Sequence, residues 1–100
     1  MATYIALSNF TDQGIRTVKE TTKRAEAVRE AAEKFGVKVK DIFWTLGQYD
    51  LVVIFEASDE AAIPAFGLSL GVAGDVRTQT FRAFSKEEMN VILSTVLATT

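Results

Sequence analysis

The sequence contains no cysteine and no histidine. Without cysteine there is no disulfide framework and no thiol nucleophile, and the usual zinc ligands are missing. Without histidine the chain also lacks the commonest general base near neutral pH. Any catalysis would depend on carboxylates, Tyr, Ser, Thr or Lys, or on a bound cofactor. No motif predicts such a cofactor or a metal site, because the glycines at 67, 71 and 74 end a predicted helix and do not match a phosphate-binding loop.

Long hydrophobic runs and an excess of positive charge are also missing. The longest wholly apolar run, residues 51–55, is far shorter than a membrane span of about 20 residues. The net charge of −2 argues against a nucleic-acid surface, which needs clustered cations. No basic leader precedes the first apolar stretch, so a secretory signal is not expected. We therefore expect a cytoplasmic protein that binds neither nucleic acid nor a membrane.

The composition that remains is that of a folded protein. Hydrophobic residues make up 48% of the chain and charged residues 24%, which is a globular balance. One hundred residues suffice for a single core. We expect residues 1–100 to form one domain.

The first half of the chain predicts a strand and a long helix. Residues 3–10 alternate and contain β-branched and aromatic side chains, as strands do. Apolar residues then recur every three or four positions from Ile15 to Phe35, which predicts a helix. Gly14 weakens the first turn and allows a short turn before the main helix. Gly36 suits the left-handed position that ends it.

Two strands are predicted next, over residues 37–46 and 49–57. Gly47 and Gln48 separate them, and two linking residues with glycine first suit a type II′ hairpin turn.

The segment after this hairpin predicts a second helix. Ser58 is its expected N-cap. Pro64 lies late for a helix start and predicts a kink or a delayed beginning. Gly71 and Gly74 close the segment.

A fourth strand is predicted over residues 75–84. Ser85 and Glu88 then form a capping box for a last helix that runs to about Leu97. The order β-α-β-β-α-β with right-handed crossovers predicts an α+β fold, the ferredoxin-like plait, with a four-stranded antiparallel sheet and both main helices on one face.

The predicted hairpin assigns residues to the two faces of the sheet. It pairs Trp44 with Leu51, and paired residues share a face. The more apolar set is expected to meet the helices: Ile5, Leu7, Ile42, Trp44, Leu46, Tyr49, Leu51, Val53 and Phe55. The open face is then expected to carry Tyr4, Ala6, Ser8, Phe43, Thr45, Asp50, Val52, Ile54, Arg77, Gln79 and Phe81. A slip of one residue would invert these assignments.

This open face is large enough to need a cover. Four strands about 4.8 Å apart and about 18 Å long make a face of roughly 350 Å², and patches of about 300–600 Å² are already large for a monomer. We expect a second copy to cover it, giving a homodimer or larger homo-oligomer of the dimeric α+β barrel type. Polar side chains inside such a barrel would line a cavity for a small-molecule metabolite. An interface without a ligand is the alternative.

Four segments resemble the GYD-domain family, small bacterial proteins named for a Gly-Tyr-Asp motif. They are MATYIALSNFTDQGIR, KRAEAVREAAEKFGVKVKDIFWTLGQYDLVVIFEA, GDVRTQTFRAF and EEM. The motif appears here as Gly47, Tyr49 and Asp50 with Gln48 interposed. The resemblance spans about residues 1–93 and implies a fold without an established activity.

The stretch GQYDLVVIFEASDEAAIPAF also resembles the ligand-binding domain of Lrp/AsnC-type transcription regulators, over about 20 residues. Those domains assemble as dimers and bind small effectors near the hairpin. The resemblance implicates Gly47, Tyr49 and Asp50. The helix-turn-helix that precedes the domain in those regulators is not found here, so DNA binding is not implied.

The candidate ligand-binding residues are Tyr4, Ser8, Thr45, Gly47, Tyr49, Asp50, Arg77 and Gln79. Several have a structural alternative. Asp50 would accept hydrogen bonds from a ligand's amine or from backbone amides at the hairpin. Tyr49 would be an acid-base residue or a packed aromatic with a tethered hydroxyl. Arg77 and Asp50 would hold a zwitterionic ligand or pair across a dimer.

Three functions remain open. The first is a stand-alone oligomeric module that binds a small molecule or has a regulatory role. The second is a cofactor-independent isomerase, lyase or oxygenase of the dimeric α+β barrel type, using Asp50, Tyr4 or Arg77. The third is a structural assembly subunit without a ligand.

Overall fold

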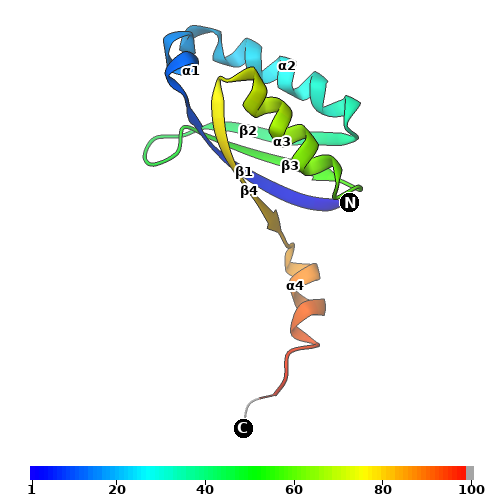
Figure 1. Cartoon of the computed structure of the whole chain (residues 1–100). Helices are drawn as coiled ribbons and strands as arrows, with labels where there is room; N and C mark the ends of the chain where they lie inside the picture. Colours follow the sequence, from blue (N-terminus) through cyan, green and yellow to red (C-terminus); the bar gives the residue numbers. More distant parts are fainter. Residues whose placement is uncertain (99–100) are drawn as a thin grey trace.

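The computed structural model describes residues 1–98 of the chain. Its four strands form one antiparallel sheet in the order β2-β3-β1-β4 (Figure 1). The elements in chain order are β1 (Ala2–Phe10), α1 (Asp12–Arg16), the 3-10 helix η1 (Val18–Glu20), α2 (Thr21–Lys34), β2 (Val37–Trp44), β3 (Leu51–Ala57), α3 (Ala62–Ala73), β4 (Val76–Ala83) and α4 (Lys86–Leu93). This α+β arrangement is consistent with the predicted ferredoxin-like plait.

The core lies between the sheet and the helices α2 and α3, which cover the same face (Figure 1). Phe66 of α3 packs edge-on against Phe55 of β3, with ring centroids 6.2 Å apart. Phe55 in turn stacks on Tyr4 of β1 at 5.7 Å, and Ala32 of α2 is fully buried beside them. Each large apolar side chain buried here stabilises the fold by about 1.5–3 kcal/mol.

The face assignment predicted for β1 is wrong. Tyr4 lies opposite Phe55, and Ser8 lies opposite Leu51. Paired residues share a face, and these two partners are buried under the helices. Tyr4, Ala6 and Ser8 therefore face the helices, whereas Ile5 and Leu7 lie on the open face. Both alternating sets of β1 are largely apolar, so strand pairing decides which set is buried, and the sequence pattern cannot.

The assignment for β2 and β3 is confirmed for the strand residues, because Trp44 pairs with Leu51 as predicted. Phe43, Val52 and Ile54 lie on the open face. The tight two-residue turn is wrong, since the ladder stops at this pair and residues 45–50 form a loop. We call these six residues the β2–β3 loop. Leu46 and Tyr49 were predicted on the helix-covered face of the sheet, but they lie in the loop and are not part of either strand.

The starts and ends of α2 and α3 agree only in part with those predicted from the sequence. Separate short turns, α1 and η1, precede α2, as the position of Gly14 suggested. The N-cap predicted at Ser58 is wrong, because α3 begins only at Ala62, and the delayed beginning is confirmed. Pro64 then lies in the first turn of α3, where its missing N–H costs no helical hydrogen bond. Gly71 lies inside α3, and Gly74 ends it at a φ of 86°.

The last helix, α4, leads away from the plait (Figure 1). Its capping box is confirmed, since Ser85 and Glu88 each accept the hydrogen bond expected of them. The helix ends at Leu93 and not at Leu97. The described chain measures 56 × 31 × 19 Å, and its radius of gyration of 15.7 Å exceeds the value of about 13 Å for a compact chain of this length. Residues 84–98 thus form an extension, which we call the C-terminal arm.

Candidate functional site

Asp50 joins the β2–β3 loop to the end of β1. Its carboxylate accepts a hydrogen bond from the backbone N–H of Phe10 at 2.9 Å. Its own N–H donates to the carbonyl of Ser8 at 2.9 Å. Of the two roles considered for Asp50, the structure shows the one in which the carboxylate binds a backbone amide. The side chain thereby fixes where the loop meets the sheet.

The rest of the loop is held by hydrogen bonds to main-chain oxygens. The hydroxyl of Thr45 donates to the carbonyl of Tyr49 at 2.6 Å, and the side-chain amide of Asn9 donates to the carbonyl of Gln48 at 2.7 Å. Gly47 has a φ of 111°, which confirms the predicted need for a glycine at this position. These contacts hold the loop backbone at Gln48 and Tyr49.

Tyr49 reaches across the sheet to β4. Its hydroxyl donates to the side-chain oxygen of Gln79 at 3.1 Å. Gln79 and Arg77 alternate with the helix-facing residues of β4 and lie on the open face, as predicted. No ion pair joins Arg77 to Asp50 within residues 1–98. Tyr49 and Gln79 are thus predicted site residues from distant elements whose side chains bind each other.

Tyr4 and Ser8 lie on the other side of the sheet from these groups. Tyr4 is buried in the aromatic core. Ser8 is 4% exposed, and its hydroxyl forms a hydrogen bond with that of Thr78 at 2.9 Å. They cannot line a cavity on the open face with Arg77 and Gln79, because the sheet itself separates them.

With this correction the open face is more apolar than predicted. Its aromatic side chains are Phe43 on β2 and Phe81 on β4, which are 53% and 45% exposed. Ile5 and Leu7 lie between these two aromatic residues on the open face, because β1 pairs with β3 on one side and with β4 on the other. The apolar residues of the open face are Ile5, Leu7, Phe43, Val52, Ile54 and Phe81.

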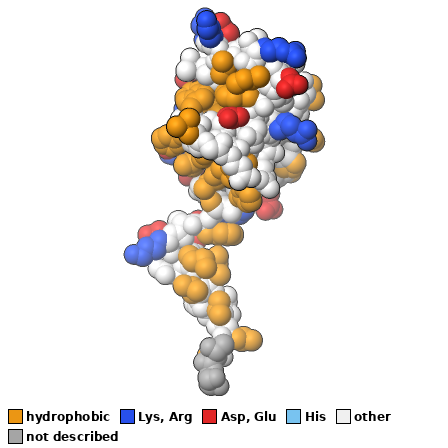
Figure 2. Space-filling view, turned by 90° about the vertical axis from the view of Figure 1, so that its left-hand side faces the viewer, with side chains coloured by type: hydrophobic (Ala, Val, Ile, Leu, Met, Phe, Trp, Pro, Cys, Tyr) orange, Lys and Arg blue, Asp and Glu red, His pale blue; other side chains and the backbone are white. Residues whose placement is uncertain are grey.

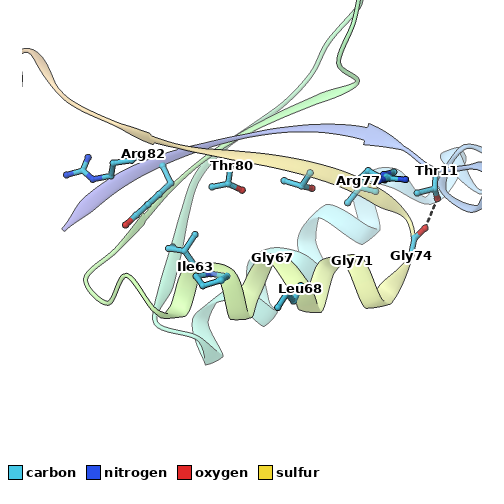
Figure 3. A pocket seen from close by; sticks show the side chains of 13 residues that line it. Thr11, Ile63, Gly67, Leu68, Gly71, Gly74, Arg77, Thr80 and Arg82 are labelled. Carbon is cyan, nitrogen blue, oxygen red and sulfur yellow. Dashed lines mark hydrogen bonds between the residues drawn. The ribbon is translucent and has the colours of Figure 1, made fainter.

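A groove that the sequence did not predict lies between α3 and β4. We call it the α3–β4 groove. It has a volume of about 860 Å³. Figure 3 shows Ile63, Gly67, Leu68 and Gly71 along α3, with Thr80 and Arg82 along β4. The signal for this groove was the spacing of Gly67 and Gly71, one turn apart, which removes side chains from the helix surface beside the strand.

The described chain carries few groups for other kinds of site. Residues 1–98 contain no cluster of three or more Asp or Glu side chains placed to hold a metal ion. They also contain no helix with the length and apolar character required to cross a membrane. The notable surfaces are the open face, the β2–β3 loop, the α3–β4 groove and the C-terminal arm.

Comparison with known proteins identifies relatives. The model of the GYD domain matches residues 4–93. A protein of Thermus thermophilus named "Glutamine synthetase and cystathionine beta-lyase binding protein" is 38% identical over 84 residues, which cover 83% of this chain and 88% of that protein.

A crystal structure of a protein from Thermus thermophilus supports the fold. It matches with a TM-score of 0.54 and 23% identity, over 85% of this chain and 95% of that one. The family match includes the strands, both main helices and the loop that carries Gly47, Tyr49 and Asp50. The chain therefore belongs to the GYD-domain family.

Proposed function

We propose that this protein is a self-associating binding module that attaches to metabolic enzymes. The observation that carries this proposal is the open face of the sheet, where six apolar side chains from four strands lie together without a covering element in the described chain. A surface of this size and character is typical of a protein–protein interface.

A second copy of the chain is the proposed cover for the open face. Identical faces brought together by a two-fold axis bury the same residues on both sides, as in most homodimers. Such a pairing would remove Phe43 and Phe81 from water in both copies, with a favourable hydrophobic contribution. The resulting assembly is the dimeric α+β barrel expected from the sequence.

Enzymes are the proposed further partners. The Thermus relative is named as a binding protein for glutamine synthetase and cystathionine beta-lyase, and the alignment covers most of both chains. By this similarity we propose that the present chain binds enzymes of the same two kinds. A binding role also agrees with the polar contacts of Asp50, Thr45 and Tyr49, which hold the loop in place.

The β2–β3 loop is the proposed contact for an enzyme. Leu46 is wholly exposed on it, while hydrogen bonds from Asn9 and Thr45 fix the loop backbone. An apolar side chain on a loop whose backbone is held by hydrogen bonds loses less conformational freedom on binding than one on an unrestrained loop. It also lies outside the set of open-face residues that a second copy would cover.

Two measurements test this function. Native mass spectrometry of the full chain is expected to show a dimer or larger assembly, and Phe81→Glu is expected to dissociate it. Ile15→Glu, which alters an exposed residue of α1, is the matched control and should leave the assembly intact. A monomeric wild-type chain would contradict self-association.

Surface plasmon resonance with purified glutamine synthetase and cystathionine beta-lyase tests the enzyme partners. Saturable binding to either enzyme is expected. Leu46→Asp should weaken it about tenfold or more, since a central apolar contact at an interface contributes about 2 kcal/mol or more. Absence of binding by the wild-type assembly to both enzymes would contradict this part of the proposal.

A small-molecule site is the second candidate function. The polar groups of Tyr49, Arg77 and Gln79 adjoin apolar side chains on the face that a second copy would cover. Polar groups in an otherwise apolar cavity are typical of ligand sites. A reproducible extra mass on the native assembly, with saturable thermal stabilisation by that compound, would support this candidate.

A further inference from the structure

The C-terminal arm carries apolar side chains that nothing in the described chain covers. Met89 and Leu93 are one turn apart on α4 and are 44% and 54% exposed. Phe84 and Val96 extend the exposed apolar surface to either side, and Figure 2 shows hydrophobic side chains along the arm. A helix of eight residues is marginal in water without tertiary packing. The arm therefore needs a docking surface.

The arm is directed away from its own plait. Two residues separate β4 from α4. Glu88 accepts a hydrogen bond from the guanidinium of Arg82 at 3.0 Å, and that guanidinium lies 4.4 Å from the centre of the Phe84 ring. Together with the Ser85 cap, these contacts fix the direction in which α4 leaves the strand. Folding the arm back onto its own groove would break them.

The α3–β4 groove is a surface of matching kind. Ile63 and Leu68 give it apolar walls, and a Cβ placed on Gly67 or Gly71 would have no atom within 4 Å. Its volume of about 860 Å³ is close to that of an eight-residue helix about 12 Å long and 10 Å across, about 900 Å³.

Charge and strand topology also favour this pairing. The groove lining includes Arg82 and no carboxylate, whereas Glu87 lies in the first turn of α4. The groove also runs along β4, an edge strand of the sheet. Proteins commonly cover such edges with a helix or loop, because an open edge invites unwanted strand pairing.

The area required by a stable dimer adds a quantitative reason. Two open faces of roughly 350 Å² bury about 700 Å², less than the roughly 1,200–2,000 Å² of a stable interface. Half the surface of an eight-residue helix is about 200 Å². Each docked arm would bury about 200 Å² of its own surface and about the same area of the groove. Two arms in two grooves would therefore raise the total buried area from about 700 Å² to about 1,500 Å², inside that range.

We propose that the C-terminal arm of each copy lies in the α3–β4 groove of a second copy, so that two copies exchange arms. This inference rests on the self-association proposed above. It adds a second contact surface to the open faces and assigns an occupant to a groove that is empty within one copy.

Introduced cysteines test the exchange directly, because the chain has no cysteine of its own. Gly71→Cys is combined with Met89→Cys in one full-length variant and with Leu93→Cys in another. The matched control replaces Gly71→Cys by Val72→Cys, since Val72 is the next residue of α3 but does not line the groove. After mild oxidation, the groove pairs are expected to give a covalent dimer and the control pairs little.

The outcomes separate the two proposals. An internal disulfide, seen as a monomer that has lost its free thiols, would show the arm in its own groove and overturn the exchange. A native dimer without a groove crosslink would overturn the exchange and leave the open-face dimer standing. A wild-type chain that is monomeric would overturn both.

A second variant checks the contribution of the arm without cysteines. Leu93→Glu places a charge on the apolar side of α4, outside the Ser85–Glu88 cap. Under the exchange, the dimer dissociation constant should rise about tenfold or more, whereas Lys86→Glu, at the start of the same helix, should change it less. Equal and small effects of both variants would overturn the docked arm.

Discussion

The carboxylate of Asp50 accepts a hydrogen bond from the backbone amide of Phe10, 40 residues earlier in the chain, at 2.9 Å. This contact joins the last residue of the β2–β3 loop to the last residue of β1. The amide of Asp50 extends the same connection by donating to Ser8. The aspartate of the family motif is thus a link between two strand ends in the fold.

Replacing Asp50 is therefore expected to lower stability. A hydrogen bond to a charged group contributes about 1.5–3 kcal/mol, so Asp50→Ala should reduce the free energy of unfolding by about that amount. Asp50→Asn keeps an acceptor oxygen and should lose less, about 0.5–1.5 kcal/mol. Urea denaturation of the full chain measures both. Asp41→Asn, at an exposed position of β2, is the control, and an equal loss there would contradict the specific role of Asp50.

Tyr49 provides a prediction that separates a tether from an acid-base residue. Its hydroxyl donates to Gln79 on the open face. Tyr49→Phe removes that hydrogen bond but keeps the ring, so the free energy of unfolding should fall by about 0.5–1.5 kcal/mol. Gln79→Leu should give a similar loss, and the double variant should lose less than the sum, because both changes remove one contact. Strictly additive losses in denaturant titrations would contradict the tether.

Gly14 is expected to tolerate no side chain. A Cβ at this position would lie 2.0 Å from the carbonyl oxygen of Asp75. That carbonyl already accepts a hydrogen bond from the amide of Thr11, and the Asp75 carboxylate lies 3.7 Å from Arg24, so the segment is held in place. Gly14→Ala should cost about 1–3 kcal/mol, whereas Ile15→Ala, at the exposed neighbouring residue, should cost less. Thermal unfolding of both variants checks this, and equal melting temperatures would contradict the close approach.

The sequence predicted the order of elements because periodicity and caps are local properties. The strands, the main helices, Gly36 and the Ser85–Glu88 capping box were found where the pattern indicated them. The start of α3 was predicted wrongly, because serine is a residue type that commonly caps helices. After Ser58 the chain instead forms a separate turn through Asp59 and Glu60 before the helix begins.

The face of β1 could not be predicted from the sequence alone. Both alternating sets, Tyr4 with Ala6 and Ile5 with Leu7, are apolar enough to be buried. The pairing of Tyr4 with Phe55 makes the choice, and this depends on residues about 50 positions away. The same limit applies to the α3–β4 groove and to the direction of the C-terminal arm, which depend on how α3 and α4 lie relative to β4. The loop residues were placed only in part, because Gly47 has the expected positive φ while the predicted two-residue turn is wrong. Tyr49, expected on the helix-covered face, lies in the β2–β3 loop and binds Gln79 on the open face.

Acid is expected to loosen the junction between β4 and α4 through Glu88. The hydrogen bond from the Ser85 backbone, assisted by Arg82, holds the pKa of Glu88 below its ordinary value of 4.5. A carboxyl group with a lowered pKa in the folded chain stabilises the fold at a pH above its ordinary pKa. That contribution is lost as the pH falls through about 4.5 and then through the lower folded value. Helical NMR shifts of residues 86–93 should therefore weaken as the pH falls through and below about 4.5.

Glu88→Gln is the matched control for this titration. The glutamine oxygen can still accept from the Ser85 N–H, as capping boxes allow, but the side chain has no proton to gain in this range. The variant should show weaker α4 order than the wild-type chain near neutral pH, because the ion pair with Arg82 is absent. Its helical shifts should then change little on acidification. If wild-type and variant α4 lost order at the same pH, another carboxylate would control the junction, and the role assigned to Glu88 would be wrong.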